Sequence, residues 1–177
     1  MSADSAIDLC FVGCGGFARR YHLPALEQDT ALRIRGIADP SPTPQTVAMA
    51  ARHGAVVVDD VAQLPRNGTR TAAICSSPHA LHVDHIGALL NAGFHTLVDK
   101  PFVLRADEAT ALRALAERKQ LVNAVAFNRR FDPACLRARA IIADGGIGEV
   151  RFVQTVQQGY ERAGWFLVPK VGGGGPF

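Results

Sequence analysis

The chain has 177 residues, long enough for one full domain or for one domain and part of another. Apolar residues make up 48% and charged residues 20%, a balance typical of a globular protein and not of a disordered one. The net charge of +3 is mild and no basic run exceeds two residues, so we expect no nucleic-acid partner. No apolar run approaches the ~20 residues that span a bilayer, so we expect no membrane partner.

The N-terminal residues and the cysteines both bear on location. Residues 1–8 carry acids and no basic stretch, so we expect no secretory signal. The four cysteines form no C-x-x-C pair and are typical of small, reduced and mostly buried thiols, Cys10, Cys14, Cys75 and Cys135. We therefore expect a cytoplasmic protein without a cysteine metal site.

Strand and helix patterns alternate from the start of the chain. The apolar run 7–12 predicts a strand, and 17–28 predicts a helix in which Pro24 introduces a kink or a restarted turn. The strands expected next are 32–38, 55–58, 71–76, 95–99 and 121–127. The helices expected between them are 43–53, closed by Gly54 as a left-handed C-terminal residue, a short turn at 61–64, 80–91 and 107–120.

A glycine-rich turn joins the first strand to the first helix. Gly13, Gly15 and Ala18 fill the pattern G-x-G-x-x-[GA]. Gly13 permits the tight turn, Gly15 lets the backbone approach a pyrophosphate, and Ala18 lets the helix pack closely on the strand. The phosphates would sit on N–H groups at the positive end of the helix. The candidate cofactor-binding residues are Gly13, Cys14, Gly15, Gly16, Phe17 and Ala18; the alternative is an ordinary glycine turn.

The alternation gives this turn the context that it needs. Strands alternating with helices of this length imply βαβ units and a parallel sheet, so the fold class is α/β, a Rossmann-type doubly wound sheet. We assign residues 1–127 to this dinucleotide-binding domain and 128–177 to the start of a second, truncated α+β domain. In that part we expect a helix at 134–143 and a strand of a different sheet at 149–158. One such strand cannot bury its apolar face alone, so residues from about 150 should be disordered, packed back, or paired between chains.

Asp39 ends the second predicted strand, 24 residues after Gly15. A carboxylate there can accept both ribose hydroxyls of an adenosine and would repel a 2′-phosphate. Pro40 follows it, with no adjacent Arg or Lys, which favours NAD and leaves NADP as an alternative. The rival interpretation is an Asp that opens a turn before proline.

The carboxyl ends of the fourth and fifth predicted strands carry further polar residues. Ser76, Ser77 and Pro78 follow the fourth strand, at the edge where open α/β sheets bind ligands. His82 is either a hydrogen-bonding residue on the cofactor side or a plain helix-surface histidine. His79, His82 and His85 do not predict a metal site, because each helical step of three turns the side chain by about 300°.

Asp99 and Lys100 end the fifth predicted strand at the same edge. A lysine there could donate a proton or polarise a hydroxyl or a carbonyl group. The rival interpretation is a solvated lysine at a strand end.

Five motifs in order resemble the glucose–fructose oxidoreductase and inositol dehydrogenase family of NAD(P)-dependent oxidoreductases. They are the glycine loop with His22-Leu23-Pro24-Ala25-Leu26, Ala38-Asp39-Pro40, Ser77-Pro78-His79-Ala80-Leu81-His82, Asp99-Lys100-Pro101, and Asn128-Arg129-Arg130-Phe131 with Ile147-Gly148-Glu149-Val150. The resemblance implies a two-domain enzyme that passes hydride between nicotinamide C4 and a sugar or cyclitol carbon. It makes Lys100 the catalytic lysine, which positions or deprotonates the hydroxyl. It also implies that Asp99, Lys100, Asn128 and Arg129 take part in cofactor binding.

The chain departs from the family pattern at several positions. Asp99 replaces a glutamate, His79 stands where an asparagine is frequent, and Phe166 follows Trp165 where an arginine is common. Family members are about twice as long, and in them the glycine run that begins here at Gly172 leads to an Asp and an acid–base His. We therefore expect this chain to be the first half of such a protein, and the activity of this half alone is doubtful. If the second half exists, we expect a polyol or sugar-like substrate. A homo-oligomer that forms through residues 149–160 is one option.

Two other functions remain open from the residues. A non-catalytic dinucleotide-binding module or sensor would keep the same glycine loop. An S-adenosylmethionine-dependent transferase also uses a glycine loop and an acid after the second strand, but it would not explain Asp99-Lys100-Pro101.

Overall fold

The computed structural model describes residues 6–66, 70–156 and 168–172. Six strands form one sheet in the order β3-β2-β1-β4-β5-β6, and every neighbouring pair is parallel. The strands are β1 (Ile7–Val12), β2 (Leu32–Ala38), β3 (Val56–Val58), β4 (Thr71–Cys75), β5 (His95–Val98) and β6 (Asn123–Val125). The predicted doubly wound parallel sheet is confirmed.

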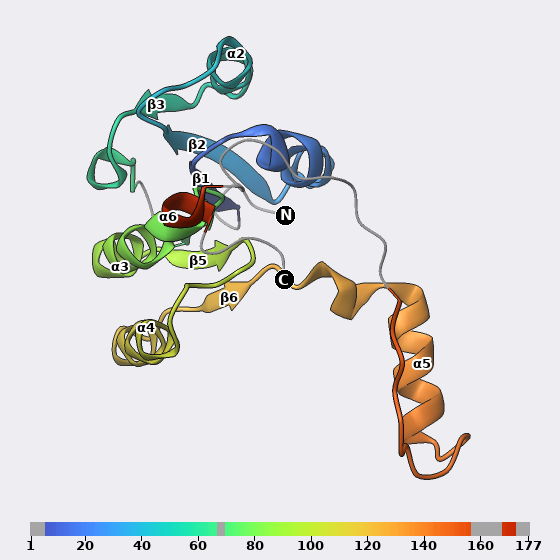
Figure 1. The fold of residues 1–177 in the computed structure, drawn as a ribbon. Coiled ribbons are helices and arrows are strands. Elements are labelled where there is room, and N and C mark those ends of the chain that lie inside the picture. The colour runs from blue at the N-terminus through green and yellow to red at the C-terminus, as the bar shows by residue number, and fades with distance from the viewer. Residues whose placement is uncertain (1–5, 67–69, 157–167, 173–177) are drawn as a thin grey trace.

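Helices cover both faces of this sheet (Figure 1). The main ones are α1 (Leu23–Leu26), α2 (Pro44–His53), α3 (His82–Ala92) and α4 (Ala106–Arg118). Further helical turns, of the π or 3₁₀ type, are η2 (Ala18–His22), η3 (Val61–Gln63), η4 (His79–Leu81) and η5 (Asn128–Phe131). The element sequence therefore matches the predicted alternation, with strand and helix ends shifted by one to a few residues.

Two apolar clusters fill the space between the sheet and these helices. Leu9 and Phe11 of β1 point into the cluster beneath α1 and α2. Cys10 and Val12 point into the cluster beneath α3 and α4. Alternate residues of one strand are thus buried on opposite faces, which is what a parallel sheet covered on both sides requires.

The first helix contains the irregularity predicted at Pro24. Residues 18–22 form a wide π-helical turn, η2, in which the N–H of Leu23 donates to the carbonyl of Ala18. Pro24 lies at the start of α1, where its missing N–H costs little. Helix α2 ends as predicted at Gly54, whose φ is +64°.

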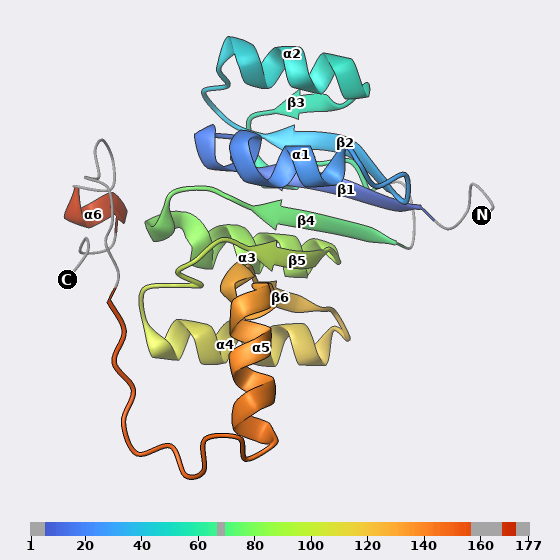
Figure 2. The ribbon, with the colours of Figure 1, turned by 90° about the vertical axis from the view of Figure 1, so that its right-hand side faces the viewer.

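Beyond β6 the chain leaves the sheet. Helix α5 (Pro133–Ala143) projects away from it and buries none of its residues (Figures 1 and 2). The strand predicted at 149–158 is wrong over its described part, because residues 149–156 form no strand and meet no strand partner among the described residues. Phe152 and Val156 are about 80% exposed there. Residues 157–160, Trp165, Phe166 and the glycine run after Gly172 lie outside the described residues.

A short helix brings the chain back to the sheet. Helix α6 (Pro169–Gly172) packs against η4, beyond the carboxyl ends of the strands (Figure 2). Nδ1 of His79 donates to the carbonyl of Gly172 over 3.0 Å. The residues from about 150 were expected to be disordered, packed back on the first domain, or paired between chains, and residues 168–172 pack back on it.

Candidate functional site

The glycine turn lies where the strand order of the sheet reverses. Strand β1 has β2 on one side and β4 on the other, with crossover helices on opposite faces. Such a switch point opens a crevice at the carboxyl ends of the strands, where doubly wound proteins bind their ligands. The turn from 13 to 16 follows β1 directly at that edge.

Each glycine of the turn meets a different requirement. Gly13 has a φ of +74°, and a Cβ there would lie 3.0 Å from the carbonyl oxygen of Ser76 and from Cα of Ser77. At Gly15 and Gly16 a Cβ would meet no protein atom within 4 Å. Gly13 is therefore needed by the fold, whereas the space over Gly15 and Gly16 is open and would admit a group that approaches the backbone.

Arg19 holds the turn in shape. Its Nη1 donates to the Cys14 carbonyl at 2.9 Å, to Oγ1 of Thr43 at 3.0 Å and to Oγ1 of Thr46 at 3.1 Å. The Thr46 hydroxyl donates to the same Cys14 carbonyl. These bonds join the turn to the start of α2, and sequence reasoning missed both Arg19 and Thr46. The available signal was an arginine next to Ala18, facing a helix that begins with a threonine cap.

Cys14 and Ala18 lie beneath the turn and Phe17 lies on its surface. The first two are 0% exposed, and Phe17 is 52% exposed. Burial raises the pKa of the Cys14 thiol to about 11, and the Arg19 charge offsets part of that rise. The Cys14 and Ala18 side chains thus support the turn from below, so a ligand above it would meet the backbone.

Asp39 ends β2 beside the turn. Its N–H donates to the Val58 carbonyl, and its Oδ1 accepts from the Ser41 N–H at 3.0 Å. The side chain therefore has the turn-forming role that the rival interpretation named, while it remains half-exposed at the carboxyl edge next to β1. This position is compatible with a ribose contact.

Asp99 joins three loops at the carboxyl edge. Its Oδ1 lies 2.8 Å from Nε2 of His22 in η2, and its Oδ2 accepts from the Ser76 hydroxyl after β4. The two side chains of the His22–Asp99 pair are only 15% and 12% exposed. Both carboxylate oxygens already have protein partners, so in this conformation Asp99 organises the loops.

His82 has no solvent-exposed surface. Its Nε2 lies 2.9 Å from the Ser77 carbonyl, and its Nδ1 lies 2.8 Å from that of Pro101 and 3.2 Å from that of Phe102. The interpretation as a plain helix-surface histidine is wrong. Both ring nitrogens are engaged by backbone, so a direct cofactor bond from His82 would require the ring to leave these partners.

The other predicted residues are spread along the same edge. Ser76, Ser77 and Pro78 follow β4 next to Gly13, and Lys100 follows β5 with an exposed side chain. Asn128 and Arg129 lie in η5 after β6, two strands away from β4, and both are exposed. The structure thus brings the glycine turn, the serines, Asp99 and His22 together, and leaves Asn128 and Arg129 further out.

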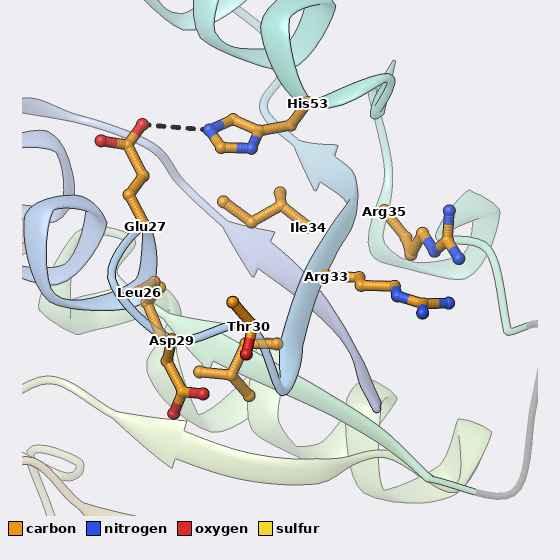
Figure 3. A pocket seen from close by; sticks show the side chains of 9 residues that line it. Leu26, Glu27, Asp29, Thr30, Arg33, Ile34, Arg35 and His53 are labelled. Atoms are coloured by element: carbon orange, nitrogen blue, oxygen red, sulfur yellow. Dashed lines mark hydrogen bonds and ion pairs between the residues drawn. The ribbon is translucent and has the colours of Figure 1, made fainter. Parts of the chain in front are cut away.

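Three further observations concern metal binding, a surface hollow and membrane crossing. The described residues contain no group of three or more His, Cys, Asp or Glu side chains placed to hold a metal ion. The hollow in Figure 3 lies at the amino end of β2, where Glu27 and His53 form a 3.1 Å pair, and includes no predicted site residue. None of the described helices is both long and apolar enough to cross a membrane.

The fold and this edge define a Rossmann-type dinucleotide-binding protein. A family model described as an oxidoreductase family with an NAD-binding Rossmann fold, GFO/IDH/MocA, matches residues 7–127. The chain belongs to this family, as its motifs predicted.

Similar proteins include dehydrogenases and a ketoreductase. A 1-carboxy-3-chloro-3,4-dihydroxycyclohexa-1,5-diene dehydrogenase of Comamonas testosteroni is 27% identical over 82% of this chain and 37% of its own length. The myo-inositol dehydrogenase Hyg17 of Streptomyces leeuwenhoekii is 31% identical over 82% of this chain and 44% of its own. The crystal structure of KijD10, a 3-ketoreductase of Actinomadura kijaniata in complex with NADP and TDP-benzene, matches with a TM-score of 0.73 and 27% identity. That match covers 82% of this chain and 45% of KijD10. The chain thus spans about two fifths of the length of these relatives.

Proposed function

We propose that this chain is the dinucleotide-binding half of an oxidoreductase that transfers hydride to or from a sugar or cyclitol-type hydroxyl or carbonyl carbon. The observation that carries the proposal is the open backbone over Gly15 and Gly16 at the switch point of the sheet. A nicotinamide dinucleotide supplies or accepts the hydride when it is bound. The residues present fit such a group, because the turn leaves room for a pyrophosphate and Asp39 stands where a ribose would lie.

The remaining contacts are assigned along the edge. The N–H groups of residues 14–18 face the pyrophosphate, and Asp39 takes the adenosine ribose. Ser76, Ser77 and Pro78 line the nicotinamide side, with Asn128 and Arg129 as outer contacts. Lys100 binds near the nicotinamide and holds or moves the proton of the substrate hydroxyl. Asp99 acts on these groups through His22 and Ser76, to which both its oxygens are bonded.

Cofactor choice follows from the charge beside the ribose. Asp39 favours NAD because its carboxylate would repel a 2′-phosphate. NADP stays an alternative, supported by KijD10, which was crystallised in complex with NADP.

The proposal also covers the domains, the assembly and the location of the protein. We propose that 1–127 form the dinucleotide-binding domain and that 128–177 begin a domain for substrate contacts and assembly. The exposed Phe152 and Val153 favour pairing between chains through residues 149–160. A cytoplasmic location fits the three buried cysteines, which are free.

The second candidate function is a non-catalytic dinucleotide-binding module or sensor. It is supported by the open backbone over Gly15 and Gly16, which fits a bound nucleotide whether or not hydride transfer follows. Fluorescence titration with NADH and NADPH tests binding, and turnover assays with cyclitols then separate an enzyme from a sensor. Absence of binding by either nucleotide would reject both functions. Binding without turnover in a protein that includes the second half would leave the sensor, and Lys100→Met should abolish turnover in such a protein.

A further inference from the structure

The β4 and β5 loops are joined by one buried ring. His82 is the first residue of α3, and its imidazole lies between the loop after β4 and the loop after β5. On one side Nε2 meets the Ser77 carbonyl, and on the other Nδ1 meets the carbonyls of Pro101 and Phe102. Pro101 directly follows Lys100, so the ring holds the backbone that carries the proposed catalytic side chain.

Ser77 is held from several directions. Its hydroxyl lies 2.9 Å from Nδ1 of His85 and 3.4 Å from the Cys75 sulfur, while its carbonyl faces His82. The β4 side of the contact is therefore anchored by β4 and α3 together. A ring bonded to this anchor can fix the β5 loop relative to the glycine turn, because Ser76 and Ser77 also touch the Gly13 position.

The hydrogen-bond chemistry constrains the ring further. A backbone carbonyl only accepts, and a neutral imidazole has a single N–H. Both ring nitrogens of His82 face carbonyl oxygens, so a neutral ring could bond only one of the two loops. Whichever nitrogen carries the proton, the ring fills the space between the two loops, 2.9 Å from the Ser77 carbonyl and 2.8 Å from the Pro101 carbonyl.

Other titratable groups lie around His82. The His79 ring stands edge-on with its centroid 5.6 Å away, and His85 lies one turn along α3. Burial lowers the pKa of His85, and the neighbouring His82 lowers it further. Cys75 and Asp99 are the titratable groups at the ends of β4 and β5, and Lys100 points to solvent.

We propose that His82 is a positioning residue whose ring, placed between the Ser77 and Pro101 carbonyls, clamps the two loops and thereby sets where Lys100 stands. This inference rests on the proposed function only in the role that it gives Lys100. In this proposal His82 makes no direct bond to the cofactor and acts on Lys100 through the backbone of the loop after β5.

The experiment observes Lys100 directly. The chain has three lysines, Lys100, Lys119 and Lys170, so reductive ¹³C-methylation gives few NMR signals and Lys100→Arg assigns one of them. The variants are His82→Phe, which removes both bonds, and His82→Gln, which can donate to one loop. The matched control is His95→Gln, because the His95 ring also bonds backbone, the Val122 N–H, but at the opposite end of β5.

We expect His82→Phe to shift or broaden the Lys100 signal without NADH and to weaken NADH binding about tenfold. His82→Gln should have an intermediate effect, and His95→Gln should leave both readouts unchanged. A folded His82→Phe protein with the native Lys100 signal would overturn the proposal. If the native protein binds no NADH, the proposed function fails, whereas the Lys100 signal still tests the clamp.

A second measurement follows the backbone of the loop after β5. Hydrogen exchange at residues 100–103 should accelerate in His82→Phe and not in His95→Gln.

Discussion

Substituting alanine for Gly13 should destabilise the fold, whereas the same change at Gly15 should leave the fold intact. The Gly13 φ of +74° is a left-handed conformation that costs an L-residue about 1–2 kcal/mol. Its new Cβ would also lie 3.0 Å from the Ser76 carbonyl oxygen and Ser77 Cα, both backbone atoms, so the β4 loop must shift. We expect a loss of about 2–3 kcal/mol of unfolding free energy.

Thermal and urea unfolding measure this loss. For a chain of this size about 2–3 kcal/mol corresponds to a fall in Tm of about 4–12 °C. Gly15→Ala should change Tm by less than about 2 °C, because a Cβ there meets no protein atom within 4 Å. The same Gly15→Ala protein should bind NADH at least about tenfold more weakly, a loss of about 1.4 kcal/mol, because the methyl group occupies the space over the turn.

The pair of variants separates two requirements of one turn. A Gly13→Ala protein as stable as the native one would contradict the steric argument. A Gly15→Ala protein that binds NADH with native affinity would show that the nucleotide does not approach the turn. That result would also remove the observation on which the proposed function depends.

Three other predictions concern the ribose site and the titratable groups. Asp39→Ala should weaken NADH about tenfold and narrow the preference for NADH over NADPH in fluorescence titrations, and unchanged affinity would place the ribose elsewhere. A thiol reagent at pH 8 should label Cys135 fast and the other three cysteines only after denaturation. Cys135 is exposed, whereas the other three are buried, and burial raises the pKa of Cys10 to about 12 and that of Cys14 to about 11. A second thiol that reacts fast in the folded protein would contradict this prediction. Burial lowers the pKa of His85 from 6.5, so between its folded value and 6.5 only the unfolded chain takes up the proton. The stability from neutral His85 is therefore complete above about pH 6.5 and is lost as the pH falls below it, and urea titrations of His85→Gln should show a weaker decline.

Most of the sheet could be predicted because its signals are local. The apolar runs, the helix end at Gly54 and the irregularity at Pro24 each depend on a few adjacent residues. The predicted strand at 149–158 failed over 149–156 because alternation alone cannot create a strand without a neighbour to pair with.

The partners of the site residues could not be predicted for a different reason. The residues bonded to Asp99 are 23 and 77 positions away along the chain, and those bonded to His82 come from two separate loops. The sequence indicates that such polar groups gather at one edge of the sheet. Which side chains form hydrogen bonds with one another there depends on the positions of the loops to within about an ångström. A pattern of residue types does not predict positions that closely.

The carboxylate of Asp99 has a consequence for how the two halves of a dinucleotide would bind. Through His22 it is tied to the helix that follows the glycine turn, and through Ser76 to the loop on the β4 side. A fragment such as AMP that orders the turn would therefore also order the opposite loop before a nicotinamide fragment arrives. The second fragment would then bind more tightly than it does alone, and by thermodynamic reciprocity each would raise the affinity of the other by the same factor.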